Sequence, residues 1–313
     1  MNRVKLEKID LSEIEIKLLL AQLSNIGYRF TRPFTARESY SDIPPSEQLL
    51  KAIILDTETT GVDHAKDRII ELGMVLFEYS PTTGQVYRVL ETFNELEDPC
   101  MLIPPESTKV HGITDDMVQG KRINEDKVKE LIAEASLIIA HNAKFDRIFV
   151  EDRLPYFADK AWACSFAQMP WIEEGLGTSK LEFLAYRYGF HYDAHRASND
   201  CHALLEVLQQ DLPETGTKAL LKLLENARIK DYKVSALNSP FESKDALKAR
   251  GYRWDSERKV WSTSITTQMI DQEIEWLKTS IYNKPSFKLQ LEKMDAFNRF
   301  SVRRGEVEIY QVS

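Results

Sequence analysis

Cysteine is scarce in this sequence, with three residues among 313, namely Cys100, Cys164 and Cys201. They are far apart, odd in number and include no C-x-x-C pair. A disulfide framework or a structural zinc site needs closely patterned or paired cysteines, so the pattern argues against both. It is typical of a protein kept in a reducing compartment.

Long hydrophobic runs are also missing near the start of the chain. The one apolar run in the first 23 residues, Leu18 to Ala21, is short and follows several charged residues. A signal peptide or a membrane span requires a much longer apolar stretch. We therefore expect a cytoplasmic protein that has no membrane contact.

Excess positive charge is absent as well, since the net charge is −8. Residues 218–313 hold 18 Lys plus Arg against 13 Asp plus Glu, a balance of +5, which leaves −13 for residues 1–217. Clustered carboxylates collect divalent cations, and bound cations can then meet phosphate groups. The acidity therefore does not exclude a nucleic-acid partner.

The length and the 43% hydrophobic content allow one large domain or two ordinary ones. Residues 1–50 are expected to form an N-terminal extension with one helix, around Ser12 to Asn25, and a connector ending at Pro44 and Pro45. Residues 51–212 have the pattern of an α/β domain. In it, a buried strand and two further strands form an antiparallel meander, and helices and strands then alternate.

The C-terminal part is predicted to be separate. Residues 211–217 are typical of a linker, residues 218–282 indicate a small α+β module, and residues 283–313 are expected to be a tail. Basic residues interleaved with aromatic ones are typical of a nucleic-acid-binding surface, but so small a module needs large side chains to make a core. We therefore expect the tryptophans Trp254, Trp261 and Trp276 to form that core and some of the cations to face phosphate. We expect the module to raise substrate affinity without a role in the chemistry. Its interleaved basic and aromatic residues are Arg250, Tyr252, Arg253, Trp254, Arg258, Lys259 and Trp261.

The first of three chemical motifs is Asp56-Thr57-Glu58-Thr59-Thr60-Gly61, at the end of a buried strand. Side chains two residues apart on a strand project from the same face, so Asp56 and Glu58 bring two carboxylates together. Such a pair repels itself unless a cation lies between the two acids. The motif predicts a metal site, and a polar turn with two solvated acids is the alternative.

The second motif, His141-Asn142-Ala143-Lys144-Phe145-Asp146, follows the apolar strand Leu137 to Ala140. It places Asp146 in the first turn of a helix, from which the carboxylate can face the same site. An acid at this position is also favoured by the helix dipole alone. By itself the motif therefore indicates a helix start as readily as a catalytic residue.

The third motif, His195-Arg196-Ala197-Ser198-Asn199-Asp200, also lies at a predicted helix start. Asp200 is expected about one turn into the helix, with His195 on the loop before it. A fixed carboxylate and a mobile imidazole suit metal-assisted hydrolysis. Either residue alone is commonplace at such a position.

Together, the four acids and the histidine follow the order and local context of the DEDDh exonuclease family: D-x-E-T-T-G on a strand, then H-N-x-x-F-D, then H-x-A-x-x-D. The resemblance extends from about Lys51 to Gln210 and includes Val110-His111-Gly112-Ile113-Thr114, a loop that members often show. Within the family, the sequence is most similar to proofreading exonuclease subunits of bacterial replicative DNA polymerases. The resemblance implies a ribonuclease H-like exonuclease fold, whose mixed sheet has three antiparallel strands, then parallel strands, and flanking helices.

The resemblance also implies two divalent cations, Mg²⁺ or Mn²⁺. By analogy with the family, Asp56, Glu58 and Asp200 bind one ion, and Asp56 with Asp146 binds the second. His195 is implied as the general base that activates water for attack on the terminal phosphodiester, which releases a nucleoside 5′-monophosphate from the 3′ end. The residues implied to position the scissile nucleotide are Thr59, Thr60 and Asn142.

The implied substrate is the 3′ end of DNA, in proofreading or repair, and a polymerase or repair partner is left open. An exoribonuclease, similar to an oligoribonuclease or an RNA-trimming enzyme, is the alternative within the same class, because only the shape of the pocket senses the 2′-hydroxyl group. The T-E-T-T-G and V-H-G-I-T forms favour the DNA-type relatives. A catalytically inactive subunit that binds nucleic-acid ends is the alternative from another class, and the complete set of five residues argues against it.

Overall fold

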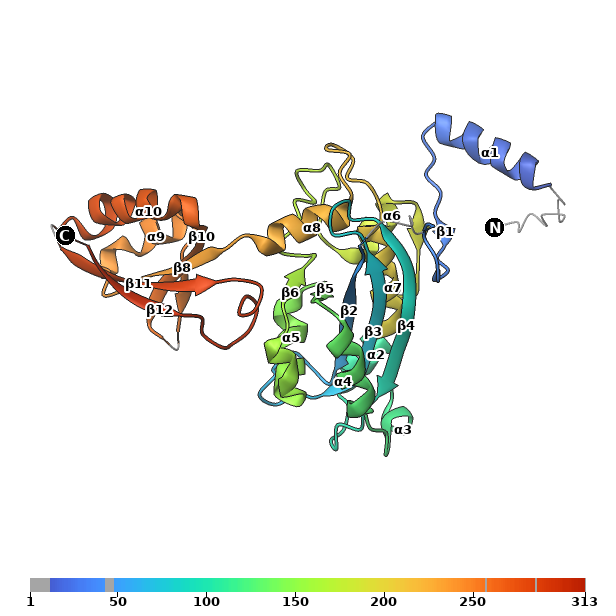
Figure 1. Ribbon diagram of the computed structural model, residues 1–313, viewed down its shortest axis with the longest axis horizontal. Coiled ribbons are helices and arrows are strands. Elements are labelled where there is room, and N and C mark those ends of the chain that lie inside the picture. The colour runs from blue at the N-terminus through green and yellow to red at the C-terminus, as the bar shows by residue number, and fades with distance from the viewer. Residues whose placement is uncertain (1–11, 43–47, 257, 285, 313) are drawn as a thin grey trace, which may run out of the picture.

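The computed structural model describes residues 12–42, 48–256, 258–284 and 286–312. Two lobes lie side by side along the longest axis of the molecule, and helix α1 (Glu13–Asn25) projects from the larger lobe (Figure 1). Ser12 caps α1, because its side chain accepts a hydrogen bond from the Glu15 amide. This confirms the predicted N-terminal helix. The end of the predicted connector, Pro44 and Pro45, lies outside the described residues.

The larger lobe is built on a five-stranded mixed sheet. Its strands are β2 (Leu50–Thr59), β3 (Ile69–Tyr79), β4 (Val86–Leu96), β5 (Leu137–Ala140) and β6 (Trp162–Cys164). Their order is β4-β3-β2-β5-β6. β4, β3 and β2 pair antiparallel, whereas β2 pairs parallel with β5, and β5 with β6. The predicted α/β fold class, with three antiparallel strands followed by parallel strands, is therefore confirmed.

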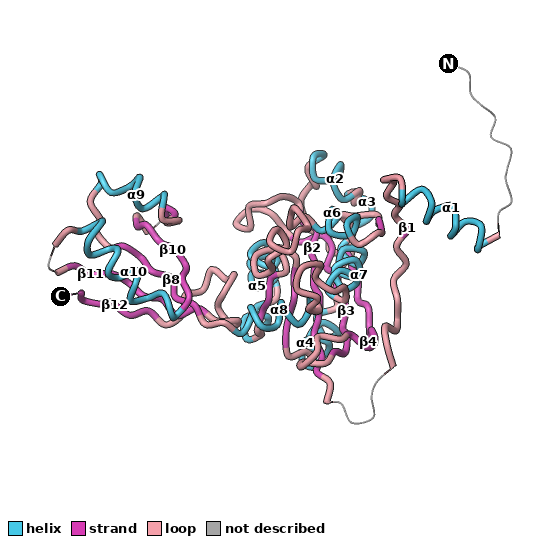
Figure 2. The backbone as a smooth tube through the Cα atoms, turned by 90° about the horizontal axis from the view of Figure 1, so that it is seen from above, coloured by secondary structure: helices cyan, strands magenta, loops and turns pink. Residues whose placement is uncertain are grey.

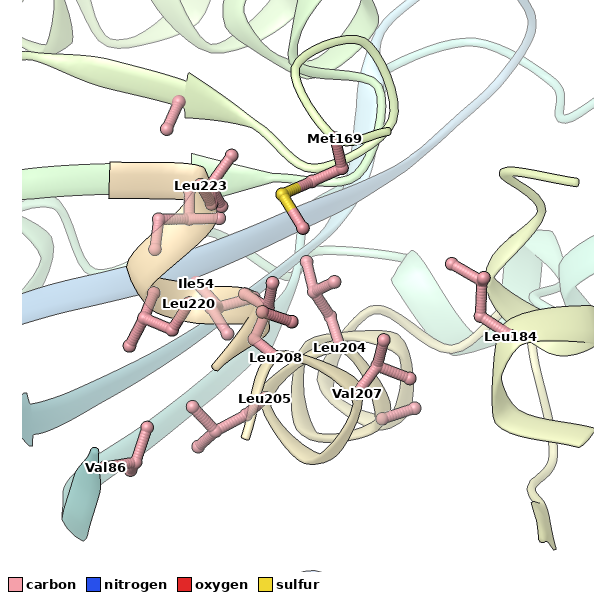
Figure 3. Close-up of a cluster of buried hydrophobic side chains, with 14 of the residues drawn as sticks. Ile54, Val86, Met169, Leu184, Leu204, Leu205, Val207, Leu208, Leu220 and Leu223 are labelled. Atoms are coloured by element: carbon pink, nitrogen blue, oxygen red, sulfur yellow. The ribbon is translucent and has the colours of Figure 1, made fainter. Parts of the chain in front are cut away.

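Helices cover both faces of this sheet, α4 and α5 on one face and α7 and α8 on the other. The helices of the larger lobe are α2 (Pro105–His111), α3 (Asp115–Val118), α4 (Glu125–Glu134), α5 (Ala143–Arg153), the 3-10 helix η1 (Pro155–Asp159), α6 (Leu181–Arg187), α7 (Ala197–Leu208) and α8 (Ala219–Arg228). Because side chains alternate along a strand, Ile53 and Leu55 enter the core beneath α4 and α5. Ala52 and Ile54 enter the opposite core, with α7 and α8. Figure 3 shows Ile54 near Leu204 and Leu208 of α7 and Leu220 of α8. No helix in the described ranges is long and apolar enough to cross a membrane.

A short parallel pair joins the N-terminal segment to the larger lobe. Its strands are β1 (Arg32–Pro33) and β7 (Phe190–His191). Nearby, Arg32 and Arg37 both form ion pairs with Glu206 of α7, a carboxylate that is almost fully buried. The N-terminal segment is therefore held against the helix that carries Asp200.

The smaller lobe is an antiparallel sheet with helices on one face. Its strands, in the order β12-β11-β8-β10-β9, are β8 (Asp231–Ala236), β9 (Arg253–Asp255), β10 (Val260–Thr266), β11 (Phe287–Met294) and β12 (Val307–Val312). Its helices are η2 (Phe241–Ser243), α9 (Lys244–Ala249), η3 (Thr267–Met269), α10 (Ile270–Trp276) and the π-helical turn η4 (Leu277–Tyr282). Leu247, Leu277 and Ile281 from these helices pack on Val234 and Leu289 of the sheet.

The structure differs from the predicted boundaries at α8. This helix was assigned to the C-terminal module, but Leu220 and Leu223 lie in the core of the larger lobe. The preceding residues, 211–217, form a loop closed by a hydrogen bond from the Leu212 amide to the Thr217 carbonyl. Helical periodicity reveals an apolar face but does not say which lobe covers it.

The described part of the predicted tail, 283–313, also differs from the prediction. β11 and β12 pair with each other, and β11 pairs with β8 at the centre of the smaller sheet. Phe287, Leu289 and Leu291 are buried on alternate positions, which is the pattern of a strand. The sequence therefore carried the signal for at least one of these strands.

The loop between β11 and β12 joins the two lobes. Residues 295–303 pack on α5, where the fully buried Arg147 forms an ion pair with Glu151. The Arg147 guanidinium also donates hydrogen bonds to three carbonyl groups of this loop, those of Ala296, Phe297 and Arg299. The smaller lobe is thus attached directly behind the helix that carries Asp146.

Candidate active site

The first predicted motif ends strand β2 as expected. Asp56 and Glu58 lie two residues apart on the strand, and their side chains share one face. Both line a cleft of about 500 Å³ at the edge of the sheet where β2 and β5 end. The positions of β2, α5 and α7 around this edge can be followed in Figures 1 and 2.

Helix α7 brings the third acid to this pair because its start lies close against β3. Gly73 faces Asp56 across the β2–β3 pairing, and a Cβ added at Gly73 would lie 2.5 Å from the carbonyl carbon of Ala197. Only glycine allows this approach. As a result, Asp56, Glu58 and Asp200 each offer a carboxylate oxygen within 4.8 Å of the other two.

Asp146 reaches the same cleft from α5. β5 runs parallel to β2, so α5 starts at the edge of the sheet where the acids of β2 lie. Asn142 turns the chain into α5 with a left-handed φ of 79°. The Asp146 carboxylate accepts hydrogen bonds from the Thr57 amide at 3.1 Å and from the Thr57 hydroxyl group at 2.9 Å. The second motif therefore positions its acid against the first.

His195 lies on the loop that precedes α7 and lines the cleft beside Asp200. Its backbone is left-handed, with a φ of 64°. Asp200 accepts hydrogen bonds from the Tyr192 hydroxyl group at 2.8 Å and from the Arg196 amide at 3.2 Å. No sequence pattern pointed to Tyr192, since no spacing rule connects it with the third motif.

Glu71 is a second residue that the sequence analysis missed. It is fully buried in β3 and binds the Arg196 guanidinium at 2.7 Å, the Asn94 amide at 2.9 Å and the Ala197 backbone amide at 3.1 Å. Burial alone would raise the pKa of Glu71, but these hydrogen bonds lower it overall. Glu71 thus holds the start of α7 in place. The sequence signal that could have revealed it is an acid within the otherwise apolar run of β3.

Burial and mutual repulsion raise the pKa values of the clustered acids. Burial, followed by the charge of Asp146, raises the pKa of Asp56 well above its ordinary range. Burial, followed by the charge of Asp200, raises the pKa of Glu58 to about 8. Burial raises the pKa of Asp146 to about 7, against the hydrogen bonds from Thr57 that lower it. Cation binding would offset this repulsion, so the donor set fits divalent metal.

The three residues expected to position substrate are not all brought to the cleft. Asn142 lines it, but Thr59 and Thr60 are not among its lining residues. The Thr59 hydroxyl group donates to the Gly61 carbonyl, and the buried Thr60 hydroxyl group donates to Asp67. The structure gives both threonines a place in the turn after β2, and the substrate contacts stay predictions.

Comparison with known proteins identifies the family of the larger lobe. Residues 53–208 match the Exonuclease (RNase T) family. The chain is also 31% identical over 165 residues to the DNA polymerase III subunit epsilon of Treponema pallidum (strain Nichols), which covers 49% of this chain and 72% of that protein. The chain belongs to the exonuclease family. The family resemblance predicted from the three motifs is confirmed.

Three further matches are less identical, and two of them cover a smaller share of the matching protein. The DNA polymerase III PolC-type protein of Thermotoga petrophila is 29% identical over 191 residues, which are 57% of this chain but 13% of that protein. Among solved structures, exonuclease X in complex with 5′ overhanging duplex DNA covers 56% of this chain and 98% of its own, with a TM-score of 0.39 and 24% identity. Apo exonuclease I covers 60% of this chain and 50% of its own, with a TM-score of 0.41 and 17% identity.

The raised pKa values predict how the stability of this exonuclease-family chain depends on pH without divalent cations. An acid whose pKa is raised on folding does not lower the free energy of unfolding at a pH below its unfolded pKa near 4. It lowers that free energy by the full amount at a pH above its folded pKa. For Asp146 and Glu58 the folded values are about 7 and about 8. Their contribution to the free energy of unfolding should therefore fall as the pH rises from about 4 to 8.

The measurement is the Tm in EDTA at pH 5.5 and pH 8.5. Glu58→Gln should raise the Tm at pH 8.5 by a few degrees, since about 1 kcal/mol shifts the Tm by roughly 2–4 °C in a domain of this size. The gain should shrink at pH 5.5, where Glu58 is already protonated. Glu130→Gln, at a largely exposed position of α4, is the control and should leave both values unchanged. An equal gain at the two pH values would contradict the assignment of the repulsion to Glu58.

Proposed function

We propose that this chain is a metal-dependent 3′-to-5′ exonuclease that acts on DNA and releases nucleoside 5′-monophosphates. The observation that carries the proposal is the meeting of four acids from β2, α5 and α7 in one cleft. They are Asp56, Glu58, Asp146 and Asp200, and His195 lines the same cleft. Such a cleft combines metal-binding oxygen atoms with a group that can move a proton.

The donor set is consistent with two divalent cations, Mg²⁺ or Mn²⁺. Asp56, Glu58 and Asp200 would hold one ion, since their oxygen atoms lie within 4.8 Å of one another. Asp56 and Asp146 would hold the other, with Asp146 oriented by its two hydrogen bonds from Thr57. When bound, such ions acidify water and stabilise negative charge on a phosphodiester. All these ligands are oxygen atoms, which Mg²⁺ prefers.

His195 is proposed as the general base. Its imidazole would take the proton from the water molecule whose oxygen attacks the terminal phosphorus. The bond from phosphorus to the 3′-oxygen of the preceding nucleotide then breaks, and that oxygen takes up a proton. Tyr192 and the Arg196 amide keep Asp200 in place beside His195 during the step. The products are a nucleoside 5′-monophosphate and a strand that is one nucleotide shorter.

DNA is the proposed substrate because one relative is named as a DNA polymerase III subunit epsilon and another as a DNA polymerase III of the PolC type. The same names support a role in proofreading or repair beside a polymerase. A polymerase partner is the finer part of this proposal. Co-elution of this chain with the polymerase subunit of its own organism in gel filtration would support it, and separate elution at micromolar concentration of both would count against it.

The test of the function is a gel assay with 5′-labelled DNA and RNA oligonucleotides of one sequence. Each is incubated with Mg²⁺, Mn²⁺ or EDTA. We expect a ladder of shortened labelled DNA with either metal and no digestion in EDTA. A 5′-to-3′ enzyme would instead release the label at once as a mononucleotide. Faster digestion of RNA than of DNA would favour an exoribonuclease.

A terminal phosphorothioate provides the control for polarity. Placed at the last linkage of the 3′ end, it should delay the ladder, whereas at the 5′ end it should have no effect on the first products. A delay caused only by the 5′ modification would contradict the proposed direction. Digestion that continues in EDTA would contradict the role of the metal.

A further inference from the structure

The smaller lobe contains a cleft of about 490 Å³ between α9 and the β9–β10 hairpin. Its aromatic lining is Phe241, Trp254 and Trp261. Phe241 and Trp254 are 77% and 50% exposed. A large aromatic side chain left in water does not contribute the stabilisation that its burial would give the fold. The cleft is therefore an aromatic surface that the core of the lobe does not use.

Trp254 is held in position by its neighbour across the hairpin. The two tryptophans pair in register between β9 and β10, and their ring centroids are 5.5 Å apart. Trp261 packs against the core of the lobe, whereas Trp254 does not belong to that core. The expectation that the tryptophans form the core is met by Trp261 and Trp276 but is wrong for Trp254. Trp261 therefore packs on the core and holds the Trp254 ring, and the Trp254 ring is exposed to solvent.

Three lysines surround these rings. Lys244 lies with its ammonium group 4.8 Å from the centre of the Phe241 ring, and Lys248 lies 5.9 Å from that of Trp261. Lys259 is the third lysine of the lining. Among the residues that the structure describes, no acidic side chain lines this cleft. Within the described ranges, none of the three ammonium groups forms an ion pair with a carboxylate. The cleft therefore presents free positive charge beside exposed aromatic faces.

A second groove continues from this cleft toward the larger lobe. Trp254 lines both, and the groove is also lined by Lys233 and Arg253 of the smaller lobe and by Lys144 of α5. Its one acidic lining residue among those described, Asp255, pairs with Arg258 at 3.7 Å. Lys144 is two residues before Asp146 on the same helix. The attachment of residues 295–303 to α5 fixes the lobes at this junction. Cations therefore lead from the aromatic cleft to the helix that borders the candidate active site.

We infer that this aromatic and basic cleft is a second nucleic-acid site, which binds single-stranded nucleic acid upstream of the 3′ end. A base would stack on Trp254 and Phe241, and neighbouring phosphates would meet Lys244 and Lys248. Aromatic faces together with cations are the combination that binds single strands without sequence preference. The inference rests on the proposed function for the identity of the ligand, and it adds a site outside the catalytic cleft.

The test measures binding without turnover, in EDTA and in a Glu58→Gln background of the full chain. Fluorescence anisotropy reports the affinity for a labelled oligo-dT strand long enough to span both clefts. Trp254→Ala should weaken binding by about 5- to 150-fold, the loss expected for one stacked base. Trp254→Phe should restore most of the affinity, because phenylalanine keeps an aromatic face. The joint change Lys244→Gln and Lys248→Gln should lower the salt slope by about 1.4, or about 0.7 for each phosphate contact.

The matched controls lie toward the other edge of the same sheet, away from the β9–β10 hairpin. Tyr310 is an exposed aromatic residue on the other edge strand, β12, and Lys288 is an exposed cation on β11. Tyr310→Ala and Lys288→Gln should leave affinity and salt slope unchanged. Equal affinities for Trp254→Ala and its parent, with equal salt slopes, would overturn the inference and leave the cleft to a protein partner. Absence of nuclease activity in the unmodified chain would contradict the proposed function but not this binding result.

Discussion

Asp56→Asn should reduce DNA hydrolysis by at least about 10³-fold while the protein stays folded. Asp56 is the acid shared by both proposed metal positions, and the charges of Asp146, Asp200 and Glu58 all act on it. Asparagine keeps the shape of the side chain but removes the negative charge. Loss of metal-assisted stabilisation of several kcal/mol corresponds to a rate loss of this size.

The measurement is the initial rate on 5′-labelled DNA at saturating Mg²⁺, together with the Mg²⁺-induced rise in Tm. Both should disappear in Asp56→Asn, and the Tm in EDTA should increase, because one repelling charge is gone. Asp126→Asn, at an exposed position of α4, is the matched control and should behave as the unmodified chain. A variant rate within tenfold of the unmodified rate would show that the metal site lies elsewhere.

His195→Ala should lower the rate by roughly 10² to 10⁴-fold, the usual contribution of a general base. The imidazole lines the cleft beside the acids, but only the carboxylates are proposed to hold the ions. The Mg²⁺-induced rise in Tm should therefore survive. This separation of rate from metal binding distinguishes His195 from Asp56.

The pH profile provides the second readout for His195. Imidazole changes its charge between about pH 5 and pH 8, so the chemistry-limited rate of the unmodified chain should rise over this range. The alanine variant should lose that rise. His64→Ala replaces a histidine that pairs with Asp152 away from the cleft, and it should retain the full rate and profile. A flat profile for the unmodified chain from pH 5.5 to 8 would exclude an imidazole base.

Much of the candidate site could be predicted from the sequence because it depends on local periodicity. The two-residue period of a strand places Asp56 and Glu58 on one face, and the apolar run before them marks β2 as buried on both sides. The order of the three motifs is typical of a family whose sheet brings the same strand and helix ends together. These relations hold within a few residues of each motif or within a known topology.

The surroundings of the site were decided by contacts between distant segments. Glu71 holds Arg196 across 125 positions of the chain, and Gly73 matters only because the start of α7 packs against it. Nothing in the residues around either position states which helix will arrive there. The sequence alone therefore identified the acids but not the groups that fix α7.

The C-terminal part shows the same division more strongly. Composition by itself determined that basic residues are concentrated there, and the alternation of Phe287, Leu289 and Leu291 marks a strand. Only the tertiary structure decided that α8 belongs to the core of the larger lobe and that Trp254 remains exposed while Trp261 packs. Burial is a property of two surfaces in contact, whereas a sequence pattern describes only one of them.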